Sequence, residues 1–186
     1  MATNGYLLED EGTTLLIDAP AGVFDWLQQK DLYPDHLLLT HQHFDHVEDA
    51  HLFEGPIHAF SPYSTELTIA ELARSWGLPI EIAEYSVDQV LENQSQLELG
   101  NFSFQLLHVP GHSPDSLVYE LPAAGLAFVG DTLFRQGAGR TDFPGGSAEL
   151  LRSGIREKLL SLPPQTQILP GHGPATTPAA EAMTFG

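Results

Sequence analysis

The residues Thr40-His41-Gln42-His43-Phe44-Asp45-His46 place three imidazoles and one carboxylate at the end of a short apolar run. Three further apolar runs also end at a residue type that binds metals, at His112, Asp131 and His172. A strand that stops in a turn containing glycine or proline presents the next side chain at the rim of its sheet. Four such strand ends can direct imidazoles and carboxylates to one point, so the sequence predicts a metal-dependent enzyme.

The spacing His41-x-His43-x-Asp45-His46 predicts how the ligands divide between ions. Alternate residues of an extended segment share one side, so His41 and His43 can bind the same ion. A turn after Phe44 would direct Asp45 and His46 toward a neighbouring ion. A lone histidine pair is more often structural, but this density of potential ligands indicates a metal site. The sequence contains no cysteine, so the ligands must be nitrogen and oxygen atoms, and a thiolate nucleophile is excluded.

The composition limits the classes of partner. The 186 residues include 25 acidic side chains against 7 lysines and arginines, a formal net charge of −18. This length favours a single domain over residues 1–186, and this acidity disfavours nucleic acid as a partner. No charged-then-apolar leader and no apolar run long enough to span a bilayer are present, so we expect a cytoplasmic protein without a membrane partner. The oligomeric state cannot be inferred from the sequence.

The few cations are concentrated in one part of the chain. Arg135, Arg140, Arg152, Arg156 and Lys158 all lie between Asp131 and His172. This clustering suits an anionic substrate. For the last three of them, however, pairing with acids on a helix surface is the expected role.

The apolar patterns predict an α/β fold. Strands are expected near residues 6–8, 13–17, 36–40, 57–60, 80–83, 97–99, 102–108, 117–120 and 126–129. Helices are expected near residues 23–30, at 69–76 with a cap at Gly77, and from Ser147 to the prolines at 163–164. This order predicts two sheets packed face to face with helices outside. The segment Arg135–Gly146 is rich in glycine and without periodicity, which is typical of a functional loop.

The motifs resemble those of a known family. The His-x-His-x-Asp-His motif, Gly111-His112-Ser113-Pro114, Gly130-Asp131 and Pro170-Gly171-His172-Gly173-Pro174 together resemble the metallo-β-lactamase superfamily over nearly the whole chain. The resemblance implies an αββα sandwich of two mixed β-sheets. It also implies two divalent ions, with zinc expected and iron or manganese as alternatives. By the same resemblance, the first ion is bound by His41, His43, His112 and Asp131, and the second by Asp45, His46, Asp131 and His172.

Within that superfamily, the stretches Gly130–Phe134 and Gly139–Gly146 resemble the short, single-domain relatives of glyoxalase II, the hydroxyacylglutathione hydrolases. The resemblance implies hydrolysis of a thioester such as S-lactoylglutathione by a metal-bound hydroxide, with Asp45 and Asp131 as the catalytic carboxylates. The chain stops at Gly186, before the C-terminal helical domain that binds glutathione in two-domain glyoxalase II. Arg140 is therefore the best candidate to bind the carboxylate of an anionic thioester.

Other interpretations of these residues stay open. Persulfide dioxygenases share the histidine cluster and the Gly-Arg-Thr-Asp-Phe stretch, and use one iron at positions matching His41, His112 and Asp131. A non-catalytic, metal-stabilised binding domain is a further alternative. A β-lactamase proper is disfavoured by the Gly-Arg-Thr-Asp-Phe loop and by the lack of a leader.

Several residues have two possible roles. Asp18 ends a strand, so it is either an acceptor for a ligand imidazole or a turn residue before Pro20. Phe134, Phe143 and Tyr63 are candidates to line a substrate groove, although aromatic side chains more often pack in a core.

Overall fold

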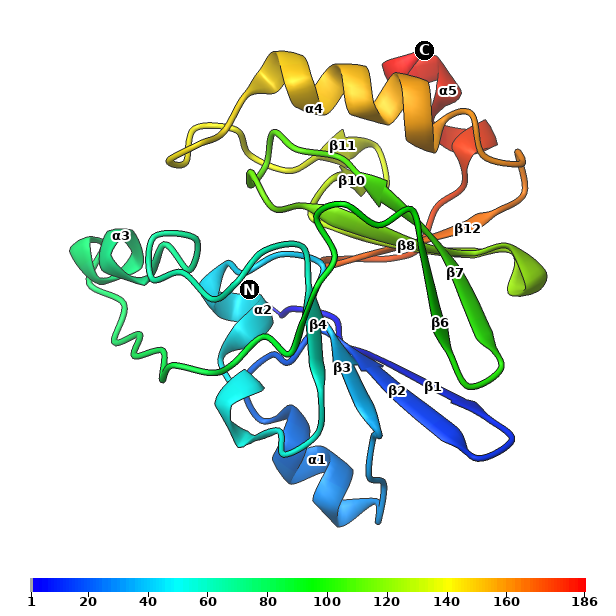
Figure 1. The fold of residues 1–186 in the computed structure, drawn as a ribbon. Helices are drawn as coiled ribbons and strands as arrows, with labels where there is room; N and C mark the ends of the chain where they lie inside the picture. Colours follow the sequence, from blue (N-terminus) through cyan, green and yellow to red (C-terminus); the bar gives the residue numbers. More distant parts are fainter. Residues whose placement is uncertain (1) are drawn as a thin grey trace.

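The computed structural model, which describes residues 2–186, contains two five-stranded sheets that pack against each other (Figure 1). The first sheet has the order β1 (Tyr6–Asp10), β2 (Thr13–Ile17), β3 (His36–Leu38), β4 (Ile57–Ala59) and β5 (Gln89–Val90). β1 and β2 form the predicted antiparallel hairpin, and β2 to β5 are parallel.

The second sheet has the order β12 (Gln167–Pro170), β9 (Leu126–Gly130), β8 (Leu117–Leu121), β7 (Phe102–His108) and β6 (Gln96–Leu99). β12 and β9 are parallel, whereas the other neighbours are antiparallel. A short hairpin of β10 (Leu133–Phe134) and β11 (Gly137–Ala138) follows β9.

Helices cover the outer face of each sheet (Figure 1). α1 (Val23–Gln29), α2 (Phe44–Val47) and the short turn η1 (Ala50–Leu52) lie on the first sheet, and α3 (Ala70–Ser75) lies to one side. α4 (Ala148–Gly154), its π-helical continuation η3 (Ile155–Leu159) and α5 (Pro178–Phe185) cover the second; the turn η2 (Pro122–Ala124) joins β8 to β9. The predicted cap of α4 is confirmed, because the Ser147 side chain accepts a hydrogen bond from the Leu150 amide. The αββα sandwich is thus confirmed.

Three apolar layers hold the sandwich together, because both faces of each sheet are buried. Leu15 and Ile17 of β2 contribute to the layer between the sheets, whereas Leu16 faces the helices on the first sheet. In β9, Phe128 faces the central layer and Val129 faces α4. This alternation follows from the two-residue period of a strand, and it fixes the register of the strands that lead to the site.

Some local predictions are wrong. Residues 80–83 form no strand; Ile82 packs on the first sheet's outer layer, and β5 takes the place beside β4. The loop after Arg135 contains the two residues of β11. Arg156 and Lys158 bind the backbone carbonyls of Phe185 and His108 rather than acidic side chains.

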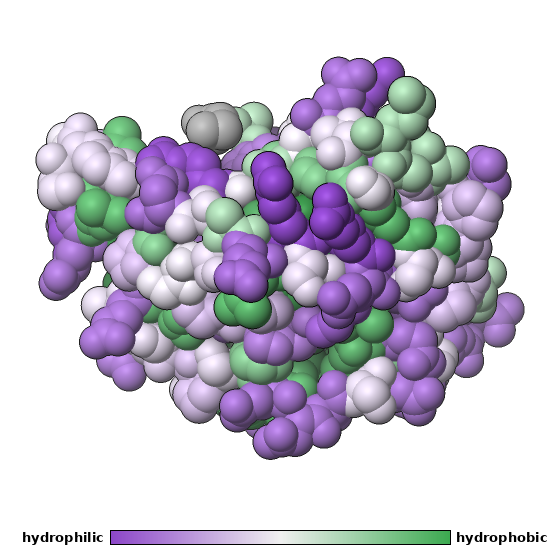
Figure 2. All heavy atoms as spheres, turned by 90° about the horizontal axis from the view of Figure 1, so that it is seen from above, coloured by the Kyte–Doolittle hydropathy of each residue, from purple (hydrophilic) through white to green (hydrophobic). Residues whose placement is uncertain are grey.

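Much of the visible surface is hydrophilic (Figure 2). Hydrophilic side chains are spread over the face shown in Figure 2, with smaller hydrophobic areas between them. None of the helices within residues 2–186 has the length and apolarity needed to cross a bilayer.

Candidate metal centre

The candidate ligands meet at one edge of the sandwich because the strands that carry them share a direction. β2 and β3 are parallel, and β7, β9 and β12 also run the same way, since β8 is antiparallel to both β7 and β9. The carboxyl ends of such strands meet at a common edge. β9 ends directly before Asp131, and β12 ends two residues before His172. The predicted convergence of four strand ends is therefore observed.

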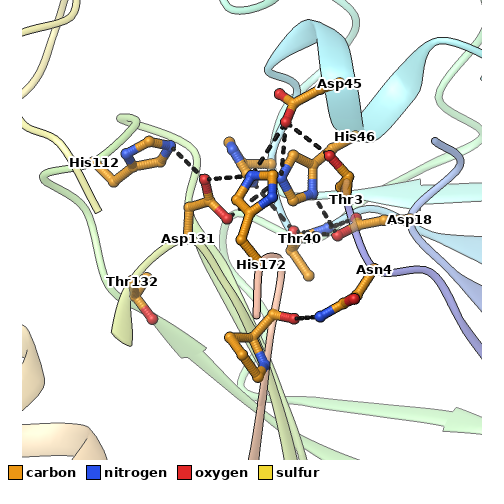
Figure 3. A network of polar contacts seen from close by, with 12 residues as sticks. Thr3, Asn4, Asp18, Thr40, Asp45, His46, His112, Asp131, Thr132 and His172 are labelled. Carbon is orange, nitrogen blue, oxygen red and sulfur yellow. Dashed lines mark hydrogen bonds and ion pairs between the residues drawn. The ribbon is translucent and has the colours of Figure 1, made fainter. Parts of the chain in front are cut away.

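The structure brings all the predicted ligands into one cluster. Their nitrogen and oxygen atoms form three groups with separations below 4.8 Å: His41, His43 and His112; His41, His46 and Asp131; and Asp45, His46 and His172. Asp131 lies in the middle (Figure 3). Its carboxylate oxygens are 3.4, 3.5 and 3.3 Å from the Nε2 atoms of His46, His112 and His172, respectively.

Four of the imidazoles have their tautomers set by acceptors on Nδ1. Nδ1 of His46 donates to Asp18 at 2.8 Å, and that of His112 donates to the carbonyl of Arg140 at 2.8 Å. Nδ1 of His172 donates to the carbonyl of Ala2 at 2.9 Å. Nδ1 of His41 lies 3.2 Å from the hydroxyl of Thr40, which itself donates to Asp18. In each ring Nε2 therefore faces the cluster, which is how ligand imidazoles are oriented.

Several of these atoms are buried without a hydrogen-bond partner among the described residues. They are Nε2 of His41, His46 and His112, and Oδ1 of Asp131. Buried polar atoms normally have partners, because desolvation without one costs free energy. Cations bound within the cluster would provide partners for these atoms. The residues therefore fit divalent metal ions, with nitrogen and oxygen donors that suit zinc, iron and manganese alike.

The three imidazoles of one group are held neutral. Burial, followed by the neighbouring imidazoles, lowers the pKa of His41 well below its usual value. Burial likewise lowers the pKa of His43 to about 3, with His112 as the next cause. Burial also lowers the pKa of His112, although Asp131 opposes this. Neutral imidazoles present their lone pairs to a cation without first losing a proton.

The other group contains carboxylates, and its imidazoles behave in the opposite way. Burial opposes a charge on His46, but Asp18 and Asp131 raise its pKa well above the usual value. Hydrogen bonds to Asp131 and Asp45 raise the pKa of His172 to about 10. Burial would raise the pKa of Asp45, but His172 and His46 lower it to about 2. Without an ion, imidazolium charges balance the carboxylates here.

Asp18 takes both of the roles considered for it. Its backbone has a positive φ of 60° at the end of β2, as a turn residue requires. Its carboxylate also accepts hydrogen bonds from the amide and hydroxyl of Thr40 at 2.8 and 2.7 Å, and from His46. Asp18 thereby connects β2 to the first residues of the histidine motif and orients the His46 ring.

A hydrogen-bond network that positions the histidine motif was missed by sequence reasoning. The buried carboxylate of Asp115 accepts a hydrogen bond from the amide of Gln42, between His41 and His43, at 3.0 Å. The Gln42 side chain in turn donates to the carbonyl of Pro62 at 3.0 Å and accepts from the hydroxyl of Tyr85 at 3.2 Å. Gln42 within the quoted motif was the only signal for this network, since its partners are distant in sequence.

The N-terminal segment holds the ligands at the mouth of the site, which sequence reasoning also missed. The hydroxyl of Thr3 donates to Asp45 at 2.9 Å, and the carbonyl of Ala2 accepts from His172. The side chain of Asn4 donates to the carbonyl of Pro170 at 3.0 Å (Figure 3). These contacts join the beginning of the chain to the end of β12.

Two glycines allow the ligands to approach so closely. A Cβ on Gly171 would collide with Oδ1 of Asp131 and the ring of His46, and one on Gly139 would collide with the carbonyl of Asp131 and the ring of His112. Any larger residue would displace the cluster, so the Gly-His and Gly-Arg pairs quoted above have a steric cause.

The remaining predicted residues lie around the cluster. Phe143 packs edge-to-face on His43, with ring centroids 5.3 Å apart, and Phe134 lies 6.0 Å from His172. Tyr63 packs instead on Tyr85 in the outer layer of the first sheet. Arg140 follows Gly139 at the rim, and its guanidinium is exposed and paired with Asp142 at 2.8 Å.

Comparison with known proteins identifies the family of the chain. The family model described as the metallo-beta-lactamase superfamily matches residues 1–172. The chain therefore belongs to the metallo-β-lactamase superfamily and is a hydrolase with that fold. Members of the superfamily typically bind divalent metals, and the cluster described above is a possible site for them.

Individual relatives are similar over nearly the full chain. A probable metallo-hydrolase of Bacillus subtilis, YqgX, is 38% identical and the match covers 93% of this chain and 86% of that protein. The hydroxyacylglutathione hydrolase GloC of Haemophilus influenzae is also 38% identical, with 91% and 84% covered.

Solved structures agree with the fold. BLEG-1, a B3 metallo-β-lactamase, superposes with a TM-score of 0.83 at 34% identity, covering 97% of this chain and 91% of its own. The di-iron-bound form of TTHA1623 gives a TM-score of 0.81 at 35% identity, covering 98% and 93%.

Proposed function

We propose that this protein is a binuclear metal-dependent thioesterase that hydrolyses anionic hydroxyacyl thioesters of the S-lactoylglutathione type. The observation that carries the proposal is the cluster of seven ligand side chains, in which four buried atoms lack hydrogen-bond partners among residues 2–186: Nε2 of His41, His46 and His112, and Oδ1 of Asp131. The relative named hydroxyacylglutathione hydrolase, at 38% identity, supports the thioester as substrate. We place the activity in the cytoplasm.

The seven ligand side chains would bind two metal ions. One ion would be bound by His41, His43 and His112, the other by Asp45, His46 and His172, and Asp131 would contact both. Two divalent ions in such a centre supply a deprotonated water near neutral pH and polarise a carbonyl group. The carboxylates of Asp131 and Asp45 would supply negative charge that balances the metal ions. Meanwhile water adds to the thioester carbonyl carbon and the carbon–sulfur bond breaks.

The products would be a hydroxy acid and a free thiol. A thiol of pKa about 8.5 leaves readily as thiolate, so the chain needs no strong general acid. We propose zinc as the resident metal, with iron or manganese as alternatives; the di-iron relative supports two ions and keeps iron open. Arg140, at the rim beside His112, would bind a carboxylate of the substrate.

Elemental analysis of the purified protein, combined with a substrate panel, tests the proposal. The panel contains S-lactoylglutathione, a neutral thioester, a β-lactam and, with oxygen uptake as readout, glutathione persulfide. We expect about two ions per chain, as in other two-metal hydrolytic sites. Thioester hydrolysis should be lost after chelation and restored by the metal. One tightly bound iron with oxygen uptake would instead establish the dioxygenase, and turnover of the β-lactam alone would also overturn the proposal.

A further inference from the structure

The guanidinium of Arg140 lies against two aromatic rings at the rim of the metal centre. Its Cζ atom is 4.6 Å from the centroid of Phe143 and 5.8 Å from that of Trp76. The two rings are themselves 6.0 Å apart. Phe143 belongs to the loop before α4, whereas Trp76 caps the end of α3, so two distant segments form this rim. A cation over such rings is attracted by their negative faces and is held in place.

This rim is directly connected to the all-imidazole half of the centre. The Phe143 ring lies 5.3 Å from His43 and 5.8 Å from His112. The carbonyl of Arg140 accepts the Nδ1 hydrogen bond of His112. A molecule bound by the guanidinium would therefore extend toward the proposed metals over a short distance.

Arg140 already binds a carboxylate, that of its neighbour Asp142. Nε donates to Oδ1 at 2.9 Å and an Nη atom donates to Oδ2 at 2.8 Å, the two-pronged geometry that guanidinium and carboxylate prefer. Both side chains are mostly exposed, at 60% and 66%. Exposed ion pairs contribute little to stability. Asp142 has no other side-chain hydrogen-bond partner among the described residues, so the pair can open without disturbing the fold.

We propose that Asp142 occupies the place of a substrate carboxylate and is displaced when the substrate binds. The substrate class is then a thioester whose thiol carrier has a carboxylate, and Trp76 and Phe143 keep the guanidinium oriented during the exchange. This inference rests on the hydrolase function proposed above and extends it to the carrier. Asp142 lowers the affinity for the substrate carboxylate by competing for Arg140, whereas Trp76 raises this affinity by keeping the guanidinium in place.

Two variants should therefore change affinity in opposite directions. Asp142→Asn removes the competing charge and should tighten binding of an anionic ligand by about two- to fivefold, the range of an exposed ion pair. Trp76→Ala should weaken the same binding by about two- to fivefold, the range of an exposed cation–π contact. Leu78→Ala is the matched control, because Leu78 is exposed to 42% just after Trp76 and should leave binding unchanged.

The test is direct binding of S-methylglutathione, which cannot be hydrolysed, and of its dimethyl ester. Trp26→Phe leaves Trp76 as the only tryptophan of the chain, so its fluorescence reports events at the rim. Calorimetry establishes first that Trp26→Phe binds as the original protein does. We expect saturable quenching by the free acid, binding at least about fivefold weaker for the ester, and tighter binding of the acid by Asp142→Asn. Because Trp76→Ala removes the fluorescent reporter, its weaker binding is measured by calorimetry.

Other outcomes overturn the inference. Equal affinity for acid and ester, no binding at all, or weaker binding of the acid by Asp142→Asn would each exclude the exchange of carboxylates at Arg140. The hydrolase proposal is tested separately, because metal-dependent turnover of a neutral thioester would persist in all of those cases.

Discussion

The two halves of the metal centre are built on different principles. His41, His43 and His112 form a group of imidazoles alone, each exposed by only 2 or 3%. In the other group, Asp45 and His172 have side chains exposed by 25 and 16%, and the carboxylate oxygen of Asp45 lies 3.1 Å from Nε2 of His172. One half is buried and uncharged. The other reaches the mouth of the site through Asp45 and His172, although its His46 is buried, and it is balanced internally by protons.

The difference indicates how each half responds to an ion. The buried half offers free lone pairs, because lowered pKa values already keep its imidazoles neutral. The half at the mouth must exchange protons on His46 and His172 for the ion, because their pKa values are raised. Its geometry also depends on Thr3 and the carbonyl of Ala2. We therefore expect the buried half to retain its metal when the other half loses it.

The largest effect is expected from Asp131→Ala, because Asp131 is the residue that both halves share. Loss of its carboxylate should lower the metal content of both halves and reduce thioester turnover by more than ~100-fold. That factor is the upper end of the effect of substituting a residue that only orients a metal ligand. Elemental analysis and initial rates measure the two effects. Asp131→Asn keeps the size of the side chain and controls for folding. Turnover retained in either variant would contradict the shared role.

Two single substitutions each disrupt one half of the metal centre. His172→Ala should leave about one ion per chain in the buried half, whereas His112→Ala should leave the remaining ion in the half at the mouth. Cobalt substitution distinguishes the two, since a nitrogen-rich and an oxygen-rich site differ in absorption. Both variants should lose most of the turnover, as a two-metal mechanism requires. Identical cobalt spectra would show that the halves do not bind ions separately.

The residues behind each half give smaller effects. In Asp18→Asn, the amide can still accept from the Thr40 amide, and asparagine tolerates the positive φ. The amide nitrogen that replaces Oδ2, however, cannot accept from the Thr40 hydroxyl or from Nδ1 of His46. We expect an affinity loss of ~10- to 100-fold for the metal at the mouth, the range for residues that orient a ligand. A competitive chelator titration measures it. An equal loss in the buried half would show that Asp18 supports the whole cluster.

Much of this arrangement was predictable from the sequence, because it depends on local order. Apolar runs that end at Asp131 or His172 predict strand ends, and parallel strands bring those ends to one edge. The motif at 41–46 predicts the density of ligands without any knowledge of the fold.

Other features depend on partners that are distant in sequence. The contact of Asp115 with Gln42 joins β3's end to the loop after β7, and no local pattern indicates it. The same is true of Thr3 with Asp45, and of Trp76 with Arg140. The segment 80–83 alternates like a strand, but β5 occupies the sheet position that it would need. A side-chain pattern predicts which face is buried, whereas hydrogen-bonded pairing also needs a free neighbour.

The smallest change in activity is expected from Asp115→Asn, which shows most clearly how the supports of the two halves differ. Burial raises the pKa of Asp115 to about 6, although hydrogen bonds from Ser113 and the Gln42 amide oppose this. The folded protein therefore holds this proton more tightly than the unfolded chain, whose carboxyl has a pKa of about 3.9. The contribution favours folding at low pH and is lost as the pH rises through about 6.

Above that pH the charged Asp115 costs on the order of 3 kcal/mol relative to an uncharged equivalent. Asparagine stays uncharged and can still accept from the Gln42 amide. The free energy of unfolding of Asp115→Asn, measured by denaturant titration from pH 4 to 7, should thus increase relative to the original protein as the pH rises. Metal content in the buried half should be unchanged. Parallel pH profiles for the two proteins would contradict the raised pKa. Loss of metal would show that the buried half, like the half at the mouth, needs a charged acceptor behind it.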